Sequence, residues 1–190
     1  MKIGFIGLGN MGAPMVRRLV AGGHKVTGYD VMESAMAALS EVKMDVSNDI
    51  LTAASEQEVV ITMLPNGEAL NRVVEAIIPV MPEGSCFIDC STVDINTTRR
   101  VAKLFKNAAI HVLDAPVSGG VGGAVAGTLT FMVGGSEDSF AIGNPLFKSM
   151  GQRVIHCGGD GAGQAAKICN NKFWLPVPPH HCHNGLHVGP

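Results

Sequence analysis

The sequence has no excess of basic side chains: 14 lysines and arginines stand against 16 aspartates and glutamates, which gives a formal net charge of −2. A protein that neutralises many nucleic-acid phosphates carries a strongly basic surface, so this balance argues against a nucleic-acid partner. The sequence also has no apolar run near the roughly 20 residues that a membrane-spanning helix requires. Its apolar runs, such as Val59 to Leu64 and Ile77 to Met81, are far shorter. We therefore expect a soluble protein with no membrane partner.

The sequence contains no CxxC pair and no even-numbered set of cysteines. Its cysteines are Cys86, Cys90, Cys157, Cys169 and Cys182. This usage is more typical of a reducing compartment than of an extracellular one. The first residues, Met1 to Phe5, form a strand pattern without an Arg/Ser-rich leader or an apolar secretory segment. We therefore expect that a targeting peptide is absent or has been removed.

The 190 residues suffice for one compact core with a small extra element, and two full-sized domains are not expected. Segments typical of strands alternate with segments typical of helices, as in a parallel sheet covered by helices. We predict strands at residues 2–6, 25–29, 42–46, 59–63, 86–89, 110–113, 128–133 and 153–157, and helices at 11–21, 34–39, 96–106 and 136–148. The strand segments are almost entirely apolar, which is typical of burial on both faces. The pattern predicts an α/β fold with an open sheet.

Caps, glycines and prolines define the remaining segments. Asp94 or Asn96 is the expected cap of the helix at 96–106, and Ser136 opens the helix at 136–148. Residues 115–123 are rich in small side chains and are expected to form a loop that lets the backbone approach a ligand. A last helix should begin after residues 161–163. It should end before Pro176, because proline has no N–H and disfavours a helical residue before it.

A glycine fingerprint follows the first predicted strand directly and opens the first predicted helix. The six residues from Gly7 to Gly12 read GLGNMG and fit GxGxxG, in which the second glycine lets a pyrophosphate approach the backbone. Asp30 ends the second strand, 18 residues after Gly12, where a carboxylate accepts hydrogen bonds from ribose hydroxyls and repels a 2′-phosphate. The pattern favours NAD over NADP; the alternative is a set of turn glycines and a solvated aspartate. The candidate cofactor-binding residues are Gly7, Leu8, Gly9, Asn10, Met11, Gly12 and Asp30.

Five ordered stretches carry a more specific pattern. They are GLGNMGAPM at 7–15, MLP at 63–65, DCST at 89–92, DAPVSGG at 114–120 and GAGQAAKICNN at 161–171. Together they resemble the β-hydroxyacid dehydrogenase family over about residues 1 to 171, and they are most similar to its members that oxidise 3-hydroxyisobutyrate. The resemblance implies a Rossmann-type, doubly wound sheet with helices on both faces, followed by a helical domain. It also implies NAD-dependent oxidation of 3-hydroxyisobutyrate to methylmalonate semialdehyde in valine breakdown.

The resemblance assigns the catalytic roles to the last predicted helix. Lys167 resembles the family's general acid/base, and a lysine suits this role because desolvation lowers its pKa toward the working pH. Asn171 would orient Lys167 or the substrate hydroxyl. Gly163, Lys167 and Asn171 are spaced at i, i+4 and i+8 on one helix face, where we expect the glycine to clear space for substrate. The alternative is a surface lysine on an amphipathic helix.

The same resemblance assigns the substrate and nicotinamide contacts. Ser118 and the amides of Gly119 and Gly120 resemble the pocket for the substrate carboxylate; a plain glycine-rich turn is the alternative. Leu64, Pro65 and Thr92 match cofactor-contacting positions near the nicotinamide. Their alternatives are a core position for Leu64 and a turn position for Thr92.

After Asn171 the family pattern stops, and most of the expected helical domain is missing. We divide the chain into an NAD-binding domain at 1–160, the start of an interdomain helix at 161–175, and an irregular tail at 176–190 outside the family pattern. This division predicts impaired activity for the chain as given. The tail contains His180, Cys182, His183 and His187. These are zinc-ligand types, but no rigid scaffold surrounds them, so we expect no metal.

Two other functions remain open at this stage. One is a nucleotide-binding or regulatory protein without catalysis, and the other is an enzyme similar to tartronate semialdehyde reductase. The expected partner is a small 3-hydroxy acid, and family members are homo-oligomers. The expected location is the mitochondrial matrix in a eukaryote, with the transit peptide absent from this chain, and the cytoplasm otherwise.

Overall fold

The computed structural model describes the backbone of residues 1–174 and the side chains of residues 1–171. The predicted tail at 176–190 lies outside the described residues. The described strands are β1 (Lys2–Ile6), β2 (Lys25–Tyr29), β3 (Asp45–Val46), β4 (Val59–Thr62), β5 (Cys86–Asp89), β6 (His111–Asp114), β7 (Val117–Ser118), β8 (Leu129–Gly134) and β9 (Gly151–Gly158). The described helices are α1 (Gly12–Ala21), α2 (Glu33–Ala37), α3 (Ile50–Ala54), α4 (Gly67–Ile77), α5 (Ile95–Asn107), α6 (Gly120–Ala126), α7 (Glu137–Met150) and α8 (Ala162–Trp174). Among these described helices, none has the length and apolar character needed to cross a membrane.

The described strands form one sheet in the order β3-β2-β1-β4-β5-β6-β8-β7, and β9 pairs with β8. The first six strands of this order are parallel. Strand β8 runs antiparallel to β6 and β7 and parallel to β9. The predicted mostly parallel sheet is therefore confirmed. The chain winds outward in both directions from β1 and β4, and in such sheets ligands bind beyond the carboxyl ends of the strands at this reversal.

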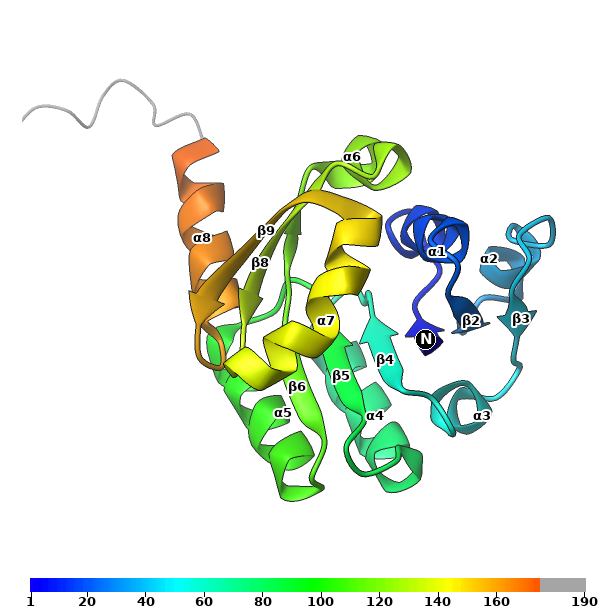
Figure 1. The fold of residues 1–190 in the computed structure, drawn as a ribbon, viewed down its shortest axis with the longest axis horizontal. Coiled ribbons are helices and arrows are strands. Elements are labelled where there is room, and N and C mark those ends of the chain that lie inside the picture. The colour runs from blue at the N-terminus through cyan, green and yellow to red at the C-terminus, as the bar shows by residue number, and fades with distance from the viewer. Residues whose placement is uncertain (175–190) are drawn as a thin grey trace, which may run out of the picture.

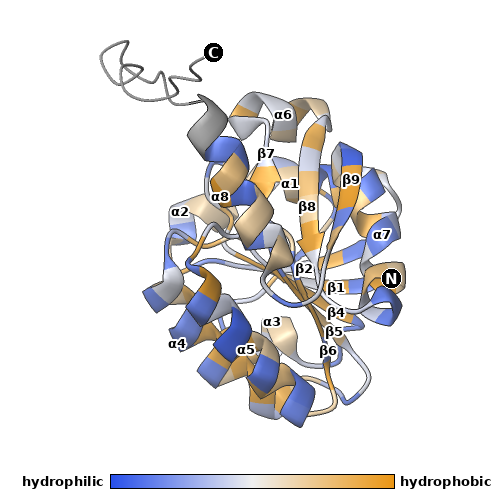
Figure 2. Ribbon diagram, turned by 90° about the vertical axis from the view of Figure 1, so that its left-hand side faces the viewer, coloured by the Kyte–Doolittle hydropathy of each residue, from blue (hydrophilic) through white to orange (hydrophobic). Residues whose placement is uncertain are grey.

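Helices cover both faces of the sheet (Figure 1). On one face α1 and α7 bury Met15 and Phe147 against the strands. On the other face α4 and α5 bury Leu70 and Phe105, and the Phe105 ring stacks on Phe87 of β5 with ring centroids 4.2 Å apart. Figure 2 shows apolar strands between helices whose outer surfaces are largely hydrophilic. Burial on both faces explains why the strand sequences are almost entirely apolar.

Most predicted elements agree with the structure to within two residues at each end. The predicted caps account for part of this agreement. The Asp94 side chain accepts a hydrogen bond from the N–H of Thr97 at the start of α5, so Asp94 rather than Asn96 is the cap. Ser136 caps α7 in the same way. These bonds join neighbours in the sequence, which is why the sequence predicts them.

Two predicted segments were wrong. In the strand predicted at 42–46, only the last two residues pair with β2. Val42 lies in a bend and Met44 in irregular backbone, and both pack partly buried against the core. Their apolar character therefore reflects packing rather than pairing. The loop predicted at 115–123 contains β7 and the first four residues of helix α6. Its glycines suggested a loop, but Gly119 and Gly127, both at positive φ, only bracket the helix.

Helices α3 and α4 were not predicted from the sequence. Asp49 caps α3 and Asn66 caps α4, each accepting a hydrogen bond from a backbone N–H of the first turn. In α4 the buried residues Leu70, Val74 and Ile77 follow helical spacing. The cap and this spacing were the available signals, and α4 is important here because it forms one wall of the cleft described next.

Candidate functional site

The turn between β1 and α1 carries the three fingerprint glycines. Gly7 has a φ of +100°, which favours glycine, and a Cβ there would lie 2.3 Å from the Met63 carbonyl oxygen. A Cβ on Gly12 would lie 1.8 Å from the carbonyl oxygen of Gly7. A Cβ on Gly9 would meet nothing within 4 Å. The first and third glycines therefore let the backbone close, and the second leaves open space where a pyrophosphate can approach.

Asp30 follows β2 directly and faces this turn. Its Oδ2 accepts a hydrogen bond from the N–H of Leu8 at 2.7 Å, and its Oδ1 accepts one from the N–H of Met32 at 2.8 Å. These bonds fix the carboxylate beside the glycine turn. In a doubly wound sheet this is the position from which an acidic residue contacts the adenosine ribose.

A cleft of about 850 Å³ opens beside the turn and Asp30. Its size falls within the roughly 300–1,000 Å³ of small-molecule sites. It is lined by Ile6, Gly7, Gly9, Asn10, Met11, Gly12, Tyr29, Asp30, Val31, Ile50, Met63, Leu64, Pro65, Ala69, Arg72, Val73 and Ala76. The open cradle at Gly9, the N-terminus of α1 and the fixed carboxylate fit a dinucleotide with its pyrophosphate at the turn.

The structure brings most of the predicted cofactor-binding residues to this cleft, with two differences. The side chain of Leu8 is buried in the core, so Leu8 takes part through the N–H that it donates to Asp30. Thr92 lies exposed on the turn after β5 and is not among the lining residues. Tyr29 and Arg72 also line the cleft and were not among the predicted residues. Arg72 was missed because helix α4 was missed.

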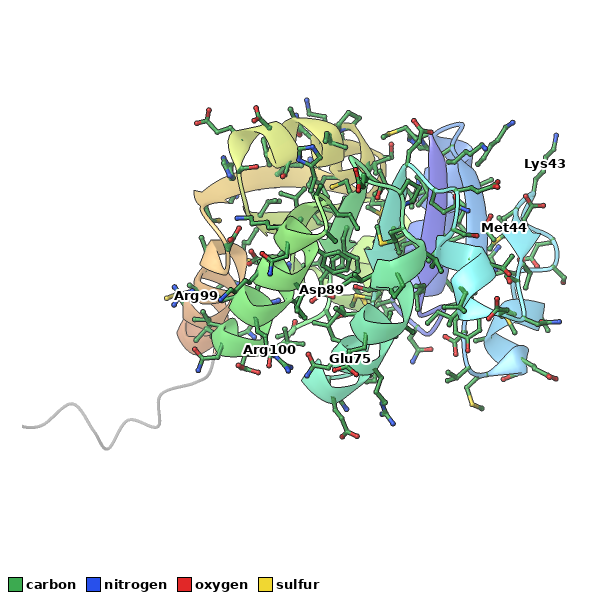
Figure 3. The ribbon with its side chains drawn as sticks, turned by 90° about the horizontal axis from the view of Figure 1, so that it is seen from below. Lys43, Met44, Glu75, Asp89, Arg99 and Arg100 are labelled. Carbon is green, nitrogen blue, oxygen red and sulfur yellow. The ribbon has the colours of Figure 1, made fainter. Side chains whose placement is uncertain are left out.

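A buried polar network joins the carboxyl ends of β4 and β5. Asp89 Oδ1 accepts hydrogen bonds from Thr62 Oγ1 at 2.8 Å and from the N–H of Ser91 at 3.0 Å. Ser91 Oγ accepts a bond from the N–H of Leu64 at 2.9 Å. Burial raises the pKa of Asp89, and its Oδ2 has no hydrogen-bond partner among the described residues. Figure 3 shows Asp89 in the interior between α4 and α5.

Helix α8 presents the predicted catalytic residues. Lys167 is half-buried, and this burial lowers the pKa of its amine because the charged form is desolvated. Asn171 lies exposed one turn further along the helix. The role expected for Gly163 was wrong: a Cβ there would lie 2.3 Å from the Met132 carbonyl oxygen and 2.6 Å from that of Asp114. Gly163 therefore clears space for the sheet rather than for a substrate.

The predicted substrate turn lies against the same helix. Ser118 ends β7, and Gly119 and Gly120 follow it with φ angles of +127° and +59°. Asn170 Nδ2 of α8 donates a hydrogen bond to Ser118 Oγ at 3.4 Å. Asn170 was not among the predicted site residues. The available signal was its position three residues after Lys167, because residues at i and i+3 share a helix face.

Residues 2–159 match the family described as the NAD binding domain of 6-phosphogluconate dehydrogenase. The chain belongs to this family. The predictions of a Rossmann-type fold and of NAD as the cofactor type are thereby confirmed. The resemblance to dehydrogenases is confirmed as well, because similar proteins are named as dehydrogenases.

The similar proteins of this family include a probable 3-hydroxyisobutyrate dehydrogenase of Mycobacterium tuberculosis. It is 45% identical over 169 residues, which are 89% of this chain and 58% of the relative. An NAD-dependent L-serine dehydrogenase of Pseudomonas aeruginosa is 38% identical over 175 residues, 90% of this chain and 59% of the relative. The solved structure of the Mycobacterium tuberculosis 3-hydroxyisobutyrate dehydrogenase with L-serine has a TM-score of 0.89 at 44% identity, covering 90% of this chain and 59% of that one. The chain thus spans under two thirds of these relatives.

Proposed function

We propose that the protein oxidises 3-hydroxyisobutyrate to methylmalonate semialdehyde with NAD, as a step of valine breakdown. The hydrogen bond from Asn170 to Ser118 carries this proposal, because it places the helix of Lys167 against the turn that resembles a carboxylate pocket. The names of the relatives support the choice of a 3-hydroxy acid, since 3-hydroxyisobutyrate and L-serine both carry a hydroxyl on the third carbon.

We also propose a division of labour along the chain. Residues 1–160 form the NAD-binding domain, residues 161–175 begin an interdomain helix, and residues 176–190 lie outside the family pattern. The family match at residues 2–159 and the start of α8 at Ala162 support the first boundary. We further propose that the protein forms a homo-oligomer. Its proposed location is the mitochondrial matrix in a eukaryote and the cytoplasm otherwise.

In the proposed mechanism the substrate carboxylate is held by Ser118 Oγ and by the N–H groups of Gly119 and Gly120. Lys167, as the neutral amine, accepts the proton of the substrate hydroxyl as the C–O bond becomes a carbonyl. NAD, held by the glycine turn and Asp30, would supply the hydride acceptor for this oxidation. The substrate leaves as the aldehyde, and the proton it gave up remains on Lys167 as an ammonium group, which then releases it to water. The lowered pKa of Lys167 favours the amine that this step requires.

The remaining predicted residues position the two reactants. Asn171 orients Lys167 or the substrate hydroxyl, and Asn170 holds Ser118. Leu64 and Pro65 line the cleft, and by the resemblance they would contact the nicotinamide together with Thr92 of the turn after β5. Asp30 accepts hydrogen bonds from the ribose and disfavours a 2′-phosphate, which makes NAD the preferred cofactor.

The test measures NADH formation with 3-hydroxyisobutyrate and with L-serine, and NADH consumption with tartronate semialdehyde. It uses the chain as given and a chimera that joins residues 1–171 to the remaining C-terminal part of the Mycobacterium tuberculosis relative. Lys167→Met is compared with Lys103→Met, which changes an exposed lysine of α5. We expect 3-hydroxyisobutyrate to be the best substrate, and only Lys167→Met to abolish turnover.

The other outcomes correspond to the alternatives. NAD binding by calorimetry without turnover of any of these substrates, in the chain and in the chimera, would establish a nucleotide-binding protein and overturn the enzyme proposal. A clear preference for tartronate semialdehyde would replace the proposed substrate while keeping the reaction class.

A further inference from the structure

A carboxylate of the sheet binds the start of the helix that carries Lys167. Asp114, the last residue of β6, accepts hydrogen bonds from the N–H of Gly161 at 2.8 Å and from the N–H of Gln164 at 2.9 Å, one to each carboxylate oxygen. The first N–H groups of a helix have no partner within the helix and are usually satisfied by a residue next to it in the sequence. Here the capping group comes from 47 residues earlier, so the cap also joins α8 to β6.

Two glycines make room for this contact. A Cβ on Gly134 would lie 2.4 Å from Asp114 Oδ1, and a Cβ on Gly163 would lie 2.8 Å from Asp114 Oδ2. Since any larger side chain would push the helix away from the carboxylate, these glycines set how closely α8 approaches the strand ends. The start of α8 is therefore held at a fixed distance from the ends of β6 and β8.

The first turn of α8 is bound a second time, by the side chain of Gln164. This side chain is 0% exposed. Its Nε2 donates a hydrogen bond to the carbonyl oxygen of Ser91 at 2.8 Å, and its Oε1 accepts one from the N–H of Val93 at 3.4 Å. Both ends of the buried amide are paired with the turn that presents Thr92. The two attachments, to Asp114 and to this turn, fix the rotation of the helix as well as its distance from the strand ends.

The attachment extends to the cofactor cleft. Ser91, whose carbonyl oxygen binds Gln164, also accepts the N–H of Leu64 through its Oγ at 2.9 Å. A continuous series of hydrogen bonds thus runs from Leu64, which lines the cleft, to the helix of Lys167. Lys167 follows Gln164 by three residues and shares its broad helix face, so a movement of Gln164 moves the amine.

We propose that Asp114 and Gln164 form a clamp that positions the Lys167 amine relative to the nicotinamide end of the cleft. Both are positioning residues, because they act through α8 and the turn after β5. The proposal rests on the proposed function for the role of Lys167. The effect of the clamp on α8 can be measured whether or not the protein turns over a substrate.

The first test replaces Gln164 by Met, which has a similar length and forms neither hydrogen bond. The control is Gln57→Met, which changes a buried glutamine just before the amino end of β4. Kinetics are measured in whichever of the chain and the chimera turns over 3-hydroxyisobutyrate. There Gln164→Met should lower kcat by about 10- to 100-fold, the scale expected for a small misplacement of a catalytic group. The KM for substrate and the Kd for NAD should change less than about 3-fold, because the side chain of Gln164 is fully buried and paired with Ser91 and Val93. Gln57→Met should leave kcat unchanged.

Gln164→Glu supplies the rescue. Burial favours the neutral carboxyl, which donates to the Ser91 carbonyl through its hydroxyl and accepts the N–H of Val93 through its other oxygen. We expect kcat within about 10-fold of the unchanged protein, clearly above that of Gln164→Met. Equal losses of kcat in the Met and Glu variants would show that the hydrogen bonds are not what positions the helix.

A second measurement does not depend on activity. The chain is reductively methylated with ¹³C-formaldehyde, and the pKa of Lys167 is followed by NMR. In Gln164→Met and in Asp114→Asn the pKa of Lys167 should rise toward the ordinary 10.5, and the amides of residues 161–164 should exchange faster. Unchanged pKa and exchange in both variants would overturn the clamp. If the pKa and the amide exchange change as expected but neither the chain nor the chimera turns over a substrate, the clamp stands and the proposed function alone is overturned.

Discussion

The carboxylate of Asp30 accepts a hydrogen bond from the backbone N–H of Leu8 at 2.7 Å, so the acidic residue after β2 and the glycine turn after β1 form one structural unit. The cofactor's ribose and pyrophosphate would bind to adjacent parts of this unit. A change at either residue therefore acts on the same end of the cleft.

The first prediction concerns cofactor choice. Asp30→Asn removes the charge that repels a 2′-phosphate, so we expect the ratio of the NADP and NAD dissociation constants to fall by about tenfold or more. Calorimetry with both cofactors measures this ratio. Asp138→Asn, which removes an exposed charge from α7, is the control. Equal affinity of the unchanged protein for NAD and NADP would contradict the assignment of Asp30.

The second prediction separates two glycines of the fingerprint. Gly12→Ala places a Cβ 1.8 Å from the Gly7 carbonyl oxygen, so the turn must open and the free energy of unfolding should fall. Gly9→Ala meets nothing within 4 Å in the protein and should leave that free energy within about 0.5 kcal/mol. It should nevertheless weaken NAD binding, because the methyl group occupies the space of the pyrophosphate. Urea unfolding and calorimetry test both variants, and a destabilised Gly9→Ala protein would refute the distinction.

The third prediction follows from the pKa of Lys167. Burial lowers this pKa from the ordinary 10.5, and alcohol oxidation requires the neutral amine. The oxidation rate should therefore rise with pH and level off at a pH below 10.5. Lys167→Ala should lower kcat by about 10² to 10⁴ and remove this rise, with little change in NAD affinity. A pH–rate profile of the active protein provides the measurement; a profile and a kcat that survive Lys167→Ala would return this residue to the helix surface.

The fourth prediction concerns stability and Asp114. Burial raises the pKa of Asp114 from 3.8 to about 6, although the N–H groups of Gln164 and Gly161 oppose the shift. Between pH 3.8 and about 6, the Asp114 carboxyl is therefore mostly protonated in the folded protein and mostly ionised in the unfolded chain. The contribution of Asp114 to the free energy of unfolding is thus present at low pH and is lost as the pH rises through about 6.

Asp114→Asn cannot titrate, so the difference in unfolding free energy between the unchanged protein and this variant should shrink by about 2–3 kcal/mol from acid to neutral pH. Urea unfolding across this range provides the measurement. Ser85 is buried and its hydroxyl donates to the carbonyl oxygen of Pro82, so Ser85→Ala is the control, and its difference from the unchanged protein should not follow this pH course. Parallel curves for the unchanged protein and Asp114→Asn would show that Asp114 has an ordinary pKa.

The sequence by itself determined the alternating strands and helices, the glycine turn, the acidic residue after β2 and the caps at Asp94 and Ser136. Each of these depends on local backbone preference or on residues close together in the chain, where spacing alone fixes which groups meet. The two predictions that failed, at 42–46 and 115–123, were those in which packing or a positive φ overrode composition.

The tertiary structure alone decided how the site is joined together. The contacts of Asn170 with Ser118, of Asp114 with Gly161 and of Gln164 with Ser91 span 52, 47 and 73 residues. It also gave Gly163 a packing role in place of a substrate role. The physical reason is the strand order, which gathers the carboxyl ends of β4, β5, β6 and β8 at one edge of the sheet, so that buried polar groups far apart in the chain must satisfy one another there.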